Sequence, residues 1–111
     1  MKDRKVFNDV FGPFSLFSMG EITSHLLLIE AAKALTYSEA ETLRGAYEAG
    51  PLSDGDVVSG RDRDELVSKG LLVKVVVMGS DGFNACTHKG AWVHRCRKAM
   101  SAATMVQGVA R

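Results

Sequence analysis

Residues 64–92 read DELVSKGLLVKVVVMGSDGFNACTHKGAW, and this stretch decides the fold. Gly70 follows an apolar helical face, at the C′ position where a left-handed backbone suits a residue without a Cβ. Residues 71–78 are nearly all β-branched or aliphatic, which favours a largely buried strand over a helix. Turn-forming residues at 79–82 then lead to a second strand, so residues 71–88 are predicted to form a hairpin.

The order of helix, glycine, hairpin and helix is that of the second half of a winged helix. The segment ELVSKGLLVKV resembles the L-x-x-K-G-L-[LIV] ending of the recognition helix in winged helix-turn-helix regulators of the MarR and PadR type. CTHKGAWV likewise resembles their L-T-x-x-G step out of the wing. The resemblance covers roughly residues 38–98. It implies an α+β, mostly α fold of the compact type found in small bacterial and phage proteins, with a three-helix core and two-stranded wing over 38–88 and flanking helices.

Composition places the chain among single-domain proteins. Its 111 residues, 46% of them hydrophobic, suffice to bury a core without disulfides, so residues 1–111 are expected to form one domain. The formal net charge of +1 is not that of a protein that coats nucleic acid non-specifically. Two cysteines without a secretory signal predict reduced thiols in the cytoplasm. No segment approaches the ~20 apolar residues of a membrane span.

Charge is unevenly distributed along the chain. Residues 51–86 hold four Lys/Arg against six Asp/Glu, whereas residues 87–111 hold five Lys/Arg and no acidic residue. A DNA-binding role would use this basic segment on phosphates. The alternative is a solvated helix face opposite acidic neighbours. The candidate phosphate contacts are Lys89, Arg95, Arg97 and Lys98.

The N-terminal region is unusually apolar. Residues 1–19 form an arm that carries four of the five phenylalanines, at positions 7, 11, 14 and 17, and is too apolar to stay disordered. It is expected to contribute to a dimer interface, with packing on its own domain as the alternative. Residues 20–35 predict a helix that is apolar around most of its circumference and therefore buried. His25 on this helix is expected to be a core or rim residue with one hydrogen bond.

A capping signal opens the predicted winged-helix core. Ser38 and Glu41 have the spacing of a capping box, and Gly50-Pro51 ends the helix that follows. Leu52 and residues 57–58 are expected in a second helix of a single turn, capped by Ser53 with Asp56, or in a loop that replaces it.

Residues 61–69 are the predicted recognition helix. Arg61 and Arg63 lie at the end that enters the groove in helix-turn-helix docking and are the candidate base contacts, with Lys69 in or near the groove. The alternative is that both arginines pair with neighbouring carboxylates on a solvated surface. The same segment is acidic, which repels phosphate but suits a protein partner. The acidic residues are Asp54, Asp56, Asp62, Asp64 and Glu65.

The C-terminal segment predicts one long helix. Thr87 is expected to cap a helix over residues 88–107, and Gly90 allows close approach of a neighbouring element. Such a helix has more surface than one small core can cover. We therefore expect the chain to form a homodimer whose interface consists of this helix and the helix at 20–35, as in MarR-like proteins. Purely intramolecular packing is the alternative.

Metal binding and catalysis find little support in the sequence. Cys86 and His88 precede His94 and Cys96, all of them zinc-ligand types. On a helix, however, His94 and Cys96 point about 200° apart and cannot both face one ion, so no metal is expected. No phosphate-binding glycine loop, paired acidic motif or nucleophile elbow is present, and we expect neither a cofactor nor an enzyme.

Two functions of different class follow from these patterns. One is a small dimeric regulator of bacterial or phage origin that binds duplex DNA through its winged helix and controls transcription. The other is a winged-helix protein-interaction module without DNA binding, such as a phage-encoded inhibitor of a host protein complex, which uses its acidic residues 54–65.

Overall fold

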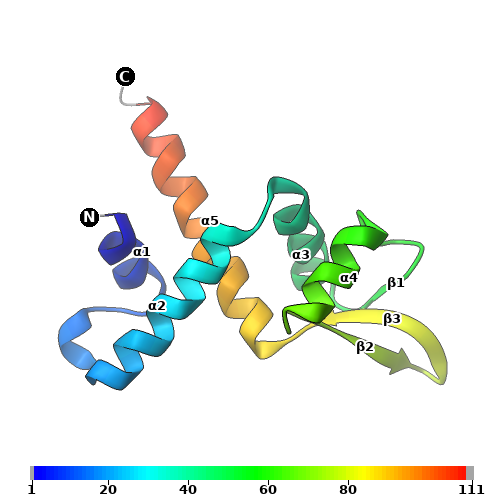
Figure 1. Cartoon of the computed structure of the whole chain (residues 1–111). Coiled ribbons are helices and arrows are strands. Elements are labelled where there is room, and N and C mark those ends of the chain that lie inside the picture. The colour runs from blue at the N-terminus through cyan, green and yellow to red at the C-terminus, as the bar shows by residue number, and fades with distance from the viewer. Residues whose placement is uncertain (1, 110–111) are drawn as a thin grey trace. The chain divides into compact units, whose positions relative to one another are not determined.

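A computed structural model describes residues 2–109, with side chains from residue 3 to residue 102. The chain divides into two compact units (Figure 1). The terminal unit comprises the chain up to Ala34 and the segment from Arg95 onward, and the central unit comprises Leu35–His94. Over the described residues the fold has five α-helices and one three-stranded antiparallel sheet. The predicted α+β, mostly α class is confirmed.

The terminal unit is built around a cluster of aromatic rings. It contains α1 (Lys2–Val10), a 3₁₀ helix (Phe14–Leu16), α2 (Met19–Ala34) and the part of α5 (His88–Val109) that follows His94. Phe7 is fully buried, and its ring contacts those of Phe11, Phe14, Phe17 and His25 at centroid distances of 4.3–5.6 Å. The Phe-rich arm therefore packs within its own unit through Phe7, whereas its predicted role in a dimer stays a prediction.

His25 is half-buried beside the aromatic cluster, as expected of a core or rim residue. Its ring stacks on Phe11 at a centroid distance of 4.1 Å, and its buried Nδ1 has no hydrogen-bond partner among the described residues. The phenylalanine rings around Nδ1 offer neither donor nor acceptor, so the predicted hydrogen bond is not made at this ring nitrogen.

The central unit consists of two helices on one side of a hairpin, followed by the first turns of α5 (Figure 1). In chain order the elements are α3 (Tyr37–Ala49), β1 (Leu52–Ser53), α4 (Gly60–Ser68), β2 (Leu72–Val77) and β3 (Ser80–Cys86). The strand order is β1-β3-β2, so both β1 and β2 are edges of the sheet. Its core consists of fully or almost fully buried apolar side chains, including Leu43, Ala46, Leu66, Leu71, Leu72 and Val93.

The step from α4 into the hairpin follows the sequence closely. The amide of Gly70 donates to the Val67 carbonyl at 3.0 Å and that of Leu71 to the Leu66 carbonyl at 2.9 Å, while Gly70 has φ +78°. These two bonds are the Schellman arrangement, which needs a left-handed residue. A Cβ on Gly90 would lie 2.1 Å from the Leu71 carbonyl oxygen, so the predicted close approach at Gly90 is confirmed.

Two helix starts differ from prediction. The capping box of α3 is formed by Thr36 and Glu39 instead of Ser38 and Glu41, because Thr36 is the last extended residue and the helix begins at Tyr37. After α3, no second helix forms: Leu52–Ser53 pairs with β3, and Asp54 to Ser59 is a loop. The loop alternative is the one observed. Thr87 does cap α5, since its hydroxyl accepts from the Gly90 amide at 2.9 Å.

The hairpin turn lies earlier than the predicted Gly79–Gly82 segment. Val77 pairs with Ser80, so the connecting residues are Met78 and Gly79, with φ values of +50° and +81°. Two left-handed residues match the twist of a tight two-residue hairpin. Gly82, with φ +82°, lies at a bulge in β3, where the register with β2 shifts by one residue. The glycine-rich segment is therefore divided between a turn and a bulge.

Candidate functional site

The charged residues of α4 and the preceding loop converge on Asp54. Its Oδ1 accepts hydrogen bonds from Arg63 Nη1 at 2.9 Å, Lys74 Nζ at 2.5 Å and Asn84 Nδ2 at 2.9 Å. Arg63 also donates from Nε to Asp64 at 3.0 Å, and its side chain is only 16% exposed. The hydrogen bond from Lys74, followed by that from Asn84, lowers the pKa of the Asp54 carboxyl below its usual value.

The sheet register brings these groups together. Asn84 stands opposite both Leu52 of β1 and Lys74 of β2, and its amide also donates to the Leu52 carbonyl at 3.2 Å. The Asp54 amide in turn donates to the Gly82 carbonyl at 2.8 Å, which fixes the loop beside the β3 bulge. Asn84 is fully buried, and its Oδ1 accepts no hydrogen bond among the described residues. The site therefore ties the loop, α4 and the sheet into one structure.

A second carboxylate joins the two helices. The buried Glu39 accepts from the Thr36 amide at 2.9 Å and from Lys69 Nζ at 3.0 Å. The backbone hydrogen bond from Thr36, with a smaller contribution from Lys69, lowers the pKa of the Glu39 carboxyl despite its burial. The ion pair connects the end of α4 to the start of α3.

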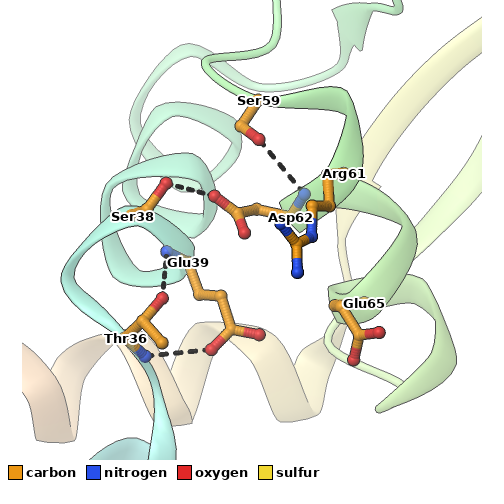
Figure 2. Close-up of a pocket in the computed structure, with 7 residues that line it drawn as sticks. All are labelled: Thr36, Ser38, Glu39, Ser59, Arg61, Asp62 and Glu65. Carbon is orange, nitrogen blue, oxygen red and sulfur yellow. Dashed lines mark hydrogen bonds between the residues drawn. The ribbon is translucent and has the colours of Figure 1, made fainter.

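A polar pocket of about 520 Å³ lies between the N-terminal ends of α3 and α4 (Figure 2). Within it, the Ser38 hydroxyl donates to Asp62, and the Ser59 hydroxyl accepts from the Asp62 amide at 3.2 Å. Figure 2 shows the Arg61 side chain extending into the space between the helices. The lining residues are Thr36, Ser38, Glu39, Ser59, Arg61, Asp62 and Glu65. Three carboxylates and one guanidinium make this pocket acidic on balance.

The three basic candidates of the predicted recognition helix have different surroundings. Arg63 and Lys69 are held by Asp54, Asp64 and Glu39, so the pairing that the sequence left as an alternative is observed for Arg63. Arg61 is exposed and forms no ion pair with any described residue, although Glu65 lies one turn away on the same helix. Among the described residues, only Arg61 of this trio therefore has a charged group that forms no ion pair.

The basic residues of α5 belong to both units. Lys89, in the central unit, donates from Nζ to the Lys69 carbonyl at 3.3 Å. Arg95, Arg97 and Lys98 belong to the terminal unit, where Arg97 donates to the Ala32 carbonyl at 3.0 Å. Lys98 is exposed.

The acidic candidates are mostly engaged within the central unit. Besides Asp54, Asp62 and Asp64, already described, Asp56 accepts from the Ser53 hydroxyl at 2.9 Å. The Glu65 carboxylate is exposed and has no partner among the described residues. The acidic surface, defined as Asp54, Asp56, Asp62, Asp64 and Glu65, is therefore largely a structural network with one unengaged carboxylate.

The cysteines and histidines are distributed over both units. Cys96 is fully buried, which raises the pKa of its thiol to about 11, and burial also raises that of the Cys86 thiol. The ring of His94 packs against Tyr47 at a centroid distance of 4.4 Å, and His88 accepts from the Trp92 indole at 3.2 Å. Among residues 2–109, no three His, Cys, Asp or Glu side chains gather as ligands of a metal ion would.

Sequence reasoning missed Lys74, Asn84 and Glu39 as members of these networks. A signal existed for Asn84, which stands between Phe83 and Ala85 in a predicted strand where a polar side chain must find partners. Glu39 could have been found three residues after Thr36 as a capping box. Lys74 carried no such signal, since only the register places it beside Asp54.

Comparisons with models of protein families, with curated protein sequences and with solved structures gave no match. None of the helices over the described residues is long and apolar enough to cross a bilayer.

Proposed function

We propose that the central unit is a winged helix that works as a protein-interaction module, binding a basic segment of a partner protein at the pocket between the N-terminal ends of α3 and α4. The element order α3, β1, α4, β2, β3 supports the winged-helix part, with α4 at the position of the recognition helix and β2–β3 as the wing. The loop from Asp54 to Ser59 stands where the first helix of a helix-turn-helix pair would lie.

The ion pairs of Arg63 and Lys69 favour a protein partner over duplex DNA. A recognition helix that reads DNA needs its basic side chains for base edges and phosphates. Here Asp54, Asp64 and Glu39 already neutralise two of the three, and releasing them would leave carboxylates facing the phosphates.

The charge of the central unit supports the same choice. Residues 35–94 contain nine Asp/Glu against six Lys/Arg, a formal net charge of −3 with histidines neutral. Such a unit repels duplex DNA at long range and attracts a cationic peptide. Glu65, exposed and unengaged at the pocket, is the first contact that a lysine or arginine of the partner would make.

A fluorescent peptide of alternating lysine and glycine tests this proposal by anisotropy at several salt concentrations. We expect binding that Glu65→Gln weakens about threefold or more, since a charged hydrogen bond at a partly exposed site contributes about 1 kcal/mol. The matched control is Asp81→Asn, which removes an exposed carboxylate of the same unit from the hairpin and should leave affinity unchanged. Equal losses in both variants would mean attraction by net charge alone and would contradict a site at α4.

DNA binding remains the second candidate, favoured by one observation. Arg61 is exposed at the N-terminal end of α4 without an ion pair among the described residues, where a groove-reading residue belongs. A duplex of random sequence in the same assay distinguishes the two functions. Duplex binding that falls steeply with salt and is lost in Arg61→Ala would establish the DNA-binding function and overturn the interaction proposal.

A further inference from the structure

The outer edge of β2 is an unusual feature of the central unit. β2 is an edge strand of six residues, so the backbone groups on its outer side have no partner in the sheet. Natural proteins commonly protect such edges with charges, prolines or bulges, because a free edge is a template for another strand. In this hairpin the bulge lies in β3, next to the inner side of β2.

The side chains of β2 give its edge little protection. The only charge, Lys74, is 46% exposed, but its ammonium group is bound to Asp54 of the same unit at 2.5 Å. On the face away from buried Leu72 and Asn84, the apolar side chains are exposed or half-buried, with Val73 44% exposed. We name this set the valine face: Val73, Val75, Val77, Phe83 and Ala85. Its continuity across both strands predicts a partner that extends the same apolar surface.

We propose that β2 pairs with β2 of a second copy of this chain, antiparallel and centred on Val75. In this register Val75 faces its own symmetry mate and Val73 faces Val77 of the other copy. Every residue of the valine face then remains on one side of a joined six-stranded sheet. This dimer is independent of the partner proposed for α4.

The sequence of the strand favours this register over the neighbouring one centred on Lys74. Centring on Lys74 would place two ammonium groups directly opposite each other, which is unfavourable. Centring on Val75 places Lys74 opposite Val76, whose side chain is 62% exposed in one copy and would pack on the aliphatic stem of the lysine. A strand of unrelated sequence would not reproduce this pairing of valine with valine along the whole face.

Disulfide formation tests the register directly. Opposite residues of antiparallel strands have Cα atoms about 4.5–5.5 Å apart, within the range that a disulfide spans. Val75→Cys should therefore form a covalent dimer at least about tenfold faster than Val73→Cys in a glutathione buffer. In the Val73→Cys variant, the substituted positions of the two copies are offset by four residues, roughly 13 Å. The unsubstituted chain measures the background from Cys86 and Cys96, and peptide mapping locates the new bond.

Sedimentation supplies the second measurement. The unsubstituted chain should sediment as a dimer, and Val75→Lys, which opposes two like charges at the symmetry axis, should sediment as a folded monomer with unchanged circular dichroism. A monomeric unsubstituted chain at high micromolar concentration would overturn the proposal. A dimer in which Val75→Cys and Val73→Cys crosslink at equal rates would overturn it too, because another surface would then hold the copies together.

Discussion

The acidic surface and the valine face are two parts of the same central unit, and they use their side chains in opposite ways. The acidic surface has the composition of a binding site, yet four of its five carboxylates have partners inside the unit. The valine face has the composition of a core, yet none of its five side chains is buried. In these two surfaces the charged side chains mainly form internal connections, whereas the apolar side chains remain at least partly accessible to solvent.

The physical reason lies in the size of the unit and the position of its strands. A unit of 60 residues, Leu35–His94, has two short helices on one side of its hairpin, and within the unit none of the five side chains of the valine face is buried. Its loop from Asp54 to Ser59 has no regular structure of its own, so ion pairs and hydrogen bonds must hold it. The following variants test this contrast, beginning with the largest expected effect.

Gly90→Ala should disrupt both surfaces at once. Its Cβ would lie 2.1 Å from the Leu71 carbonyl oxygen, so the start of α5 must move away from the start of the hairpin. We expect a loss of about 3 kcal/mol in the free energy of unfolding, measured by urea denaturation. Gly55→Ala is the control, because no atom lies within 4 Å of its added Cβ, and it should change stability by less than about 0.5 kcal/mol.

Asn84→Ala should show that the acidic surface is chiefly structural. The variant removes the hydrogen bonds to Leu52 and Asp54 from a fully buried site, at an expected cost of about 2 kcal/mol. Urea denaturation measures this cost, with exposed Asn8→Ala as the control. Unchanged stability in Asn84→Ala would mean that the Asp54 network does not hold the loop.

Glu39→Gln should change how the stability of the central unit depends on pH. Because the pKa of this carboxyl is lowered in the fold, its contribution is present above the unfolded pKa of about 4.3 and is lost as pH falls through the folded pKa. We expect the variant to lose about 1 kcal/mol at pH 7 and to show a weaker loss of stability on acidification. Thermal unfolding between pH 3 and 7 measures both, and Glu48→Gln, an exposed carboxylate on the same helix, is the control.

Met78→Asn should have the smallest effect and the opposite sign. Met78 is fully exposed with φ +50°, a conformation that asparagine adopts more readily in a two-residue hairpin turn. We expect a gain of about 0.5 kcal/mol in urea denaturation. Gly79→Ala, which adds a Cβ at φ +81°, should lose stability instead, and a gain in that variant would contradict the turn assignment.

Much of the fold could be predicted from local patterns. The glycine stop at Gly70 after α4, the hairpin and the Thr87 cap each depend on residues near in sequence. The errors have the same origin. Thr36 and Ser38 both offer a cap with a glutamate three residues on. The register of the strands places the turn at Met78 and Gly79, at the start of the predicted turn segment instead of across all of it.

Less of the candidate site could be predicted from the sequence, because the site depends on which charged side chains form ion pairs in the folded chain. The sequence allows Arg63 two roles, base contact or ion-pair partner, and contains no reason to choose between them; the structure shows the ion pairs. The choice depends on Asp54, nine residues away, and on Lys74 and Asn84 beside it.

By itself, the sequence determined the α+β class and the order of helix, glycine stop, hairpin and capped helix, because those features follow from backbone preferences of neighbouring residues. Only the tertiary structure decided which side chains form ion pairs and hydrogen bonds and which remain accessible to solvent. The register of β2 and β3 places Lys74 and Asn84 at Asp54, and the strand order leaves β2 at an edge with its valines accessible. Contacts between residues twenty or more positions apart depend on the packing of the whole unit, which local preferences do not specify.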